Sequence, residues 1–110
     1  MNEPWNQKLF DEFRTVRDAM RDAKREKDHS QVITLGRRIV QIDQEMPGLG
    51  IALGIFMRDM GDAYVELGQK ADAMVYYRGA VSAFKKAKKA KPDDWEKDIA
   101  RLEKKMQGLA

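Results

Sequence analysis

The sequence predicts a single all-α domain, residues 1–110, built from about five helices. In five segments of the 110-residue chain, apolar residues recur at steps of three and four, the spacing of one helix face. None of these segments alternates apolar and polar residues as a half-buried strand would. Proline, glycine or aspartate stands between the segments, and these residues begin and end helices. With 43% hydrophobic and 35% charged residues, the chain can bury one core under a charged surface.

The first two helices are predicted over residues 4–27 and 28–46. Pro4 suits a first helical turn, because the N–H that it lacks has no partner there. Asp28 and Gln31 have the spacing of a capping box at the start of the second helix. The two apolar stripes are Leu9, Phe13, Val16, Met20 and Ala23, then Val32, Leu35, Ile39, Ile42 and Met46.

The remaining helices are predicted over residues 49–67, 70–91 and 93–108. Gly68 is placed to end the third helix in a left-handed conformation, and Pro92 breaks the fourth. Their apolar stripes are Leu53, Met57, Met60, Tyr64 and Leu67, then Ala73, Tyr77, Ala80, Phe84 and Ala87, and finally Trp95, Ile99, Leu102, Met106 and Leu109.

Two local patterns refine these elements. Asp93 and Glu96 repeat the capping-box spacing at the start of the fifth helix. Gly54 and Gly61 lie seven residues apart on one face of the third helix, so we expect them to permit close approach of a neighbouring helix.

Residues 57–80 resemble a repeat of the tetratricopeptide (TPR) family, a helix-turn-helix unit with small and aromatic residues at set offsets. The matching residues are Gly61, Tyr64, Gly68, Ala73, Tyr77 and Ala80. The resemblance implies a solenoid of antiparallel helix pairs, with Gly61 close to Ala73 and the fifth helix as a cap. A degenerate repeat precedes this one, with Gly36 where an aromatic is usual. An ordinary five-helix bundle is the alternative architecture.

In the TPR family, the first helices of successive pairs line a concave groove that often grips peptides. The residues at the corresponding positions here are Arg14, Arg17, Arg21, Lys24, Arg58 and Asp62, with Asp62 as the lone acid. Arginine binds carboxylates through paired hydrogen bonds. The resemblance therefore implies a protein-interaction scaffold or adaptor that binds an acidic peptide or a partner helix. The alternative is pairing within the first helix, where Asp11, Asp18 and Asp22 could neutralise these arginines.

Two further interactions are open at this stage. Fewer than three good repeats leave an apolar edge, which predicts a homodimer. The formal charge of +3 is concentrated in five lysines, here called the lysine cluster: Lys85, Lys86, Lys88, Lys89 and Lys91. A small basic protein that binds nucleic acid through this cluster is the alternative function. No aromatic residue is interleaved for base stacking, and lysines also suit a solvated helix end.

The residue types argue against an enzyme, a cofactor site or a metal site. The chain has no cysteine, and His29 is its one histidine. Asp28 and Ser30 are its sequence neighbours, whereas a catalytic triad needs side chains that converge in space. The absence of cysteine and of a visible signal peptide predicts a cytoplasmic protein, and no stretch is apolar for long enough to cross a bilayer.

Overall fold

The computed structural model describes the backbone of residues 5–47, 53–90 and 95–110, and the side chains of these residues except 87–90. Five helices account for nearly all of this backbone: α1 (Gln7–Arg25), α2 (His29–Glu45), α3 (Leu53–Glu66), α4 (Lys70–Ala90) and α5 (Glu96–Leu109). The described residues contain no strand. The predicted all-α class with five helices is confirmed.

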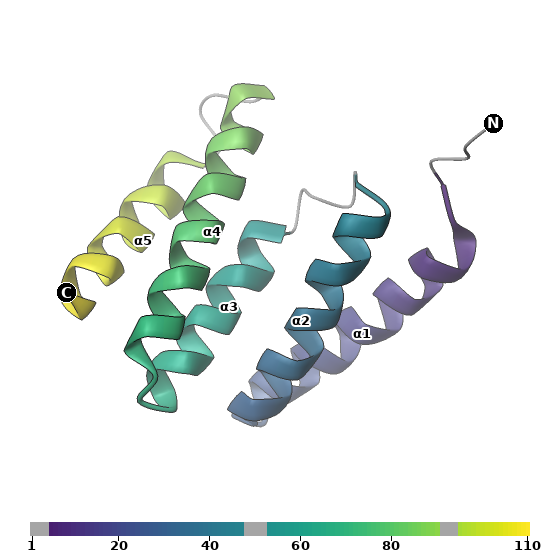
Figure 1. Ribbon diagram of the computed structural model, residues 1–110, viewed down its shortest axis with the longest axis horizontal. Coiled ribbons are helices and arrows are strands. Elements are labelled where there is room, and N and C mark those ends of the chain that lie inside the picture. Colours follow the sequence, from purple (N-terminus) through teal and green to yellow (C-terminus); the bar gives the residue numbers. More distant parts are fainter. Residues whose placement is uncertain (1–4, 48–52, 91–94) are drawn as a thin grey trace.

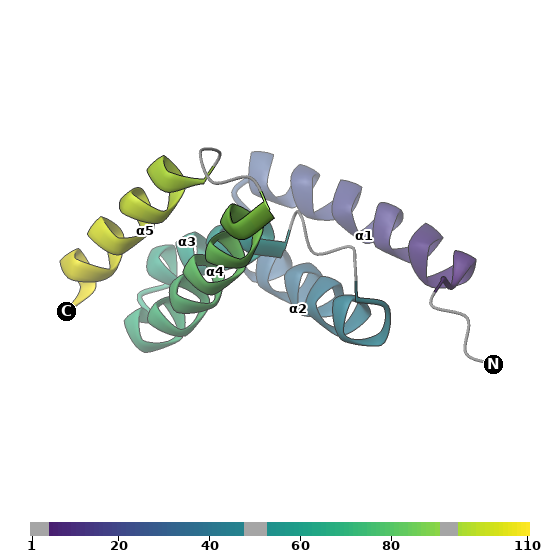
Figure 2. The same cartoon turned by 90° about the horizontal axis from the view of Figure 1, so that it is seen from above.

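The helices form an array in which each one packs chiefly against its neighbours in the chain. Figure 1 shows α5, α4, α3 and α2 side by side, with α1 behind α2. Viewed from above in Figure 2, α1 and α5 lie on the same side of the layer that contains α2 and α4. Helix α3 lies between α1 and α5 along the array. The three odd-numbered helices therefore share one face of the molecule.

The helix starts differ in part from the prediction. The side chain of Asn6 accepts a hydrogen bond from the backbone N–H of Leu9, so α1 begins at Gln7 rather than at residue 4. Asp28 caps α2 as predicted, through the N–H of Gln31. The N-cap position of α5 is occupied by Trp95, which makes no side-chain cap bond. α5 begins at Glu96 rather than at residue 93. The predicted capping box includes Asp93, which, like Pro4, residues 49–52 and Lys91, lies outside the described residues.

The turns of the two helix hairpins are built alike. Lys27 and Gly68 both have positive φ, 59° and 75°. The N–H that follows each one bonds back to a helix carbonyl, Asp28 to Ala23 and Gln69 to Tyr64, both at 2.9 Å. This is the pattern of a left-handed helix end, and Gly68 confirms the predicted stop. The first hairpin uses a lysine where the second uses a glycine.

The core follows the predicted stripes, with one error and several additions. The largest fully buried side chains come from α2, α3, α4 and α5: Phe84, Ile39, Ile42, Met60 and Leu102. Leu67 was expected in the stripe of the third helix, but it follows the last residue of α3 and is 41% exposed. Ile33, Phe56 and Ala63 are buried instead. Ala87 has no described side chain.

The glycines of α2 and α3 explain the close helix contacts. A Cβ on Gly54 would meet the ring of Phe84, and one on Gly61 would meet the ring of Tyr77, so both face α4 as expected. The nearest partner of Gly61 is thus Tyr77 rather than Ala73, because the ring extends across the helix pair. A Cβ on Gly36 would meet Met60, so a methionine of the next pair fills the space where an aromatic was expected.

Candidate protein-interaction groove

The shared face of α1, α3 and α5 contains two adjoining hollows. The first, the α1–α3 hollow, has a volume of about 300 Å³ and is lined by Arg17, Met20, Arg21, Lys24, Ile55, Phe56 and Asp59. The second, the three-helix hollow, has a volume of about 260 Å³ and is lined by Lys24, Arg58, Asp62, Asp98, Arg101 and Lys105. Lys24 belongs to both, and together we call them the groove.

Five of the six residues predicted to line the groove are brought together here. Arg14 is the exception: it lines neither hollow, and its guanidinium lies 5.8 Å from the centroid of the Phe10 ring. Residue 14 is on the N-terminal half of α1, whereas the groove is formed by the C-terminal half.

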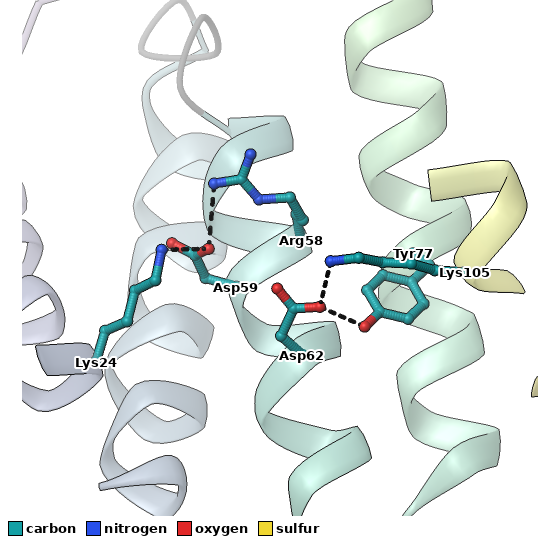
Figure 3. A network of polar contacts seen from close by, with 6 residues as sticks. All are labelled: Lys24, Arg58, Asp59, Asp62, Tyr77 and Lys105. Carbon is teal, nitrogen blue, oxygen red and sulfur yellow. Dashed lines mark hydrogen bonds and ion pairs between the residues drawn. The ribbon is translucent and has the colours of Figure 1, made fainter. Parts of the chain in front are cut away.

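Asp59 anchors the α1 side of the groove. Its carboxylate accepts a hydrogen bond from Nζ of Lys24 at 3.1 Å and lies 3.3 Å from Nη2 of Arg58 (Figure 3). Only 11% of its side chain is exposed. The prediction that Asp62 is the lone acid of the groove is therefore wrong. The pairing with Lys24 joins residues from two helix pairs, which sequence spacing alone does not reveal.

Asp62 anchors the α5 side. Its Oδ1 accepts hydrogen bonds from the hydroxyl of Tyr77 at 2.5 Å and from Nζ of Lys105 at 2.9 Å (Figure 3). Nζ of Lys105 also lies 5.7 Å from the centroid of the Tyr77 ring, within range of a cation–π contact. Burial raises the pKa of Tyr77, and its bond to the Asp62 carboxylate raises it further. Helices α3, α4 and α5 thus meet at one carboxylate.

The arginines of α1 are only lightly neutralised by their own helix. Arg17 lies 3.2 Å from Asp18, and Arg21 lies 4.0 Å from the same carboxylate. Asp22 pairs instead with Arg25, at 2.6 Å. Exposed pairs of this kind contribute roughly 0–1 kcal/mol. Pairing within α1 and contact with a ligand are therefore compatible, since a ligand carboxylate can compete for these cations at little cost.

The groove carries a surplus of positive charge. Six cations and three carboxylates line the two hollows. Sequence reasoning missed Asp98, Arg101 and Lys105, because the fifth helix was expected only to cap the stack. It missed Asp59 of α3 because the pairing of Asp59 with Lys24 joins two helix pairs. The spacing of Arg101 and Lys105, one helical turn apart, was the available signal.

The described side chains of the lysine cluster, those of Lys85 and Lys86, line neither hollow of the groove. Lys85 and Lys86 are exposed on α4. Lys86 acts on Asp43 of α2: burial raises the pKa of that carboxyl, and the charge of Lys86 opposes the rise. The side chains of Lys88 and Lys89, and all of Lys91, are outside the described residues.

The outward face of α5 is mostly polar, with Lys97, Glu103, Lys104 and Gln107 exposed. The large hydrophobic side chains that the described residues expose are Trp5, Val65, Leu67 and Val75. A homodimer remains a prediction, which a single chain does not test.

Comparison of the chain with protein-family models, curated proteins and solved structures finds no match. Over the ranges that the structure describes, no helix is both long and apolar enough to span a membrane. Within the same ranges, no group of three or more histidine, aspartate or glutamate residues could hold a metal ion.

Proposed function

We propose that this chain is a protein-interaction module that holds an acidic segment of a partner protein in the groove. One observation carries the proposal: cations from three separate helices line two adjoining hollows and outnumber the carboxylates there. Opposite charge attracts an acidic segment and orients it.

The chemistry of the lining favours binding over catalysis. The described side chains that line the two hollows include arginine, lysine, aspartate and apolar residues, but no serine, cysteine or histidine. Asp59 and Asp62 are both paired with cations from neighbouring helices. The groove therefore offers carboxylate-binding groups on helices that are already held in place.

The architecture supports the same proposal. In an array of hairpins, residues on one face of successive helices form an extended surface, as the TPR resemblance implies. Arginine suits such a surface, because its planar group can bind both oxygens of a carboxylate. Arg21 and Arg101 stand on opposite sides of the groove, on α1 and α5.

The test is fluorescence anisotropy with a labelled glutamate-rich peptide in a glycine–serine background. We expect binding that weakens as salt rises. Charge reversal at both positions, Arg21→Glu with Arg101→Glu, should reduce the binding free energy by about 2 kcal/mol, the size of interface hot spots. The matched control reverses Arg78 and Lys104, which are exposed and line neither hollow. Circular dichroism melts check that both variants fold.

An equal loss in the control would show that only net charge matters and would refute the groove. A labelled single-stranded oligonucleotide serves as the competing probe. Tighter binding of the oligonucleotide, abolished by glutamine at the lysine cluster, would favour the nucleic-acid alternative instead.

A further inference from the structure

The two hollows differ in chemistry. The floor of the α1–α3 hollow is apolar: Met20 and Phe56 are buried, with 2% and 9% exposure, and Ile55 is half-buried beside them. Cations from α1 form its rim. The three-helix hollow, in contrast, is lined by charged side chains alone.

We infer that the segment held in the groove is amphipathic: a large apolar side chain seats in the α1–α3 hollow, and acidic side chains next to it contact the cationic rim and the three-helix hollow. This inference rests on the proposed function and specifies its ligand. The partner is thus a protein segment in which leucine, isoleucine, methionine or phenylalanine stands among aspartates or glutamates.

The position of Lys24 links the two parts of this ligand. Lys24 lines both hollows, and Asp59 holds its ammonium group at 3.1 Å. Because the hollows adjoin at one residue, consecutive side chains of a single segment can reach both. Asp59 also lines the apolar hollow, so it disfavours an acidic side chain at the floor and favours acids at the rim.

Apolar contact and charge make different contributions to such binding. Exposed ion pairs are weak and are screened by salt, whereas burial of a large apolar side chain is favourable and is not screened by salt. The apolar side chain should therefore supply much of the affinity at physiological salt, and the acids should supply orientation.

The experiment compares three labelled peptides of equal length by anisotropy. One contains glutamates in a glycine–serine background, the second adds one leucine, and the third keeps the leucine but replaces every glutamate by glutamine. We expect the second peptide to bind about tenfold more tightly than the first at physiological salt, a difference that corresponds to one apolar contact. The third should bind more weakly than the second. This series needs no protein variant.

A variant then locates the apolar contact. Ile55→Ala should lower the affinity for the leucine peptide toward that for the glutamate-only peptide. It should leave the affinity for the glutamate-only peptide unchanged. Val75→Ala is the control, since Val75 is 58% exposed on α4 and lines neither hollow. Melting curves establish that both variants are folded.

Three outcomes are decisive. If the leucine adds no affinity, or if Ile55→Ala weakens both peptides equally, the amphipathic ligand is wrong while the proposed function stands. If neither glutamate-containing peptide binds even at low salt, the proposed function fails as well. If the glutamine peptide binds as tightly as the second, charge plays no part and the inference is overturned.

Discussion

The contact between Gly61 and Tyr77 allows a sharp test of how the second hairpin packs. In Gly61→Ala, the new Cβ would lie 2.5 and 2.6 Å from two carbons of the Tyr77 ring, closer than carbon atoms approach without a shift. The ring is held, because Tyr77 is 2% exposed and its hydroxyl bonds to Asp62. Alanine gains about 1 kcal/mol in helix propensity over glycine, whereas overpacking costs about 1–3 kcal/mol. We therefore expect a net destabilisation of up to about 2 kcal/mol.

Gly79→Ala is the matched control on α4. The nearest atom to its new Cβ is the terminal methyl of Met57, the end of a flexible side chain that can rotate away. This variant should therefore equal or exceed the wild type in stability. Urea denaturation followed by circular dichroism measures both. A Gly61→Ala protein as stable as Gly79→Ala would refute the packing described for α3 and α4.

Four further predictions concern stability and partner class. The raised pKa of Tyr77 stabilises the fold below the ordinary tyrosine pKa of about 10, and this contribution is lost as pH rises further. Urea titrations above that pH should show a fall in stability that Tyr77→Phe reduces; an unchanged fall would contradict it. Arg38 lowers the pKa of Glu12 through two hydrogen bonds, so their pairing stabilises above the ordinary glutamate pKa and is lost as pH falls. Arg38→Gln should flatten the acid side of the stability profile, and an identical profile would show that the pair is not formed in solution. Asp28→Ala removes the cap of α2 and should lower the free energy of unfolding in urea by about 1 kcal/mol. An unchanged free energy would mean that the hairpin turn fixes the start of α2 without the Asp28 side chain. Glutamine at all positions of the lysine cluster should leave the anisotropy of the glutamate-rich peptide unchanged, and a lost signal would move the binding site to the cluster.

The parts of the fold that depend on local sequence were predictable. Apolar spacing identified all five helices, Asp28 identified a helix start and Gly68 a helix end, because each of these signals acts within one or two turns of the chain. Errors also arose locally. Asn6 caps α1 after the expected start at Pro4, and Leu67 continues the apolar stripe of the third helix by one position beyond the point where the backbone leaves the helix.

The groove was predictable only in part. The cations of α1 and α3 came from aligning the two hairpins, which share an offset: the same number of residues separates Val32 from Ala73 and Asp28 from Gln69. The contribution of Arg101 and Lys105 was missed, because it depends on how α5 packs beside α3. Their spacing shows only that Arg101 and Lys105 share one face of a helix; it does not show which other helices that face meets.

The most direct test of the central claim is amide correlation spectroscopy of the labelled protein during titration with the glutamate-rich peptide that carries one leucine. The account predicts concentration-dependent shifts at the C-terminal half of α1, the middle of α3 and α5, clustered on residues that line the two hollows. Amides near the lysine cluster and on the outer faces of α2 and α4 should change little. Shifts centred on residues 85–91, or spread evenly over the surface, would contradict it.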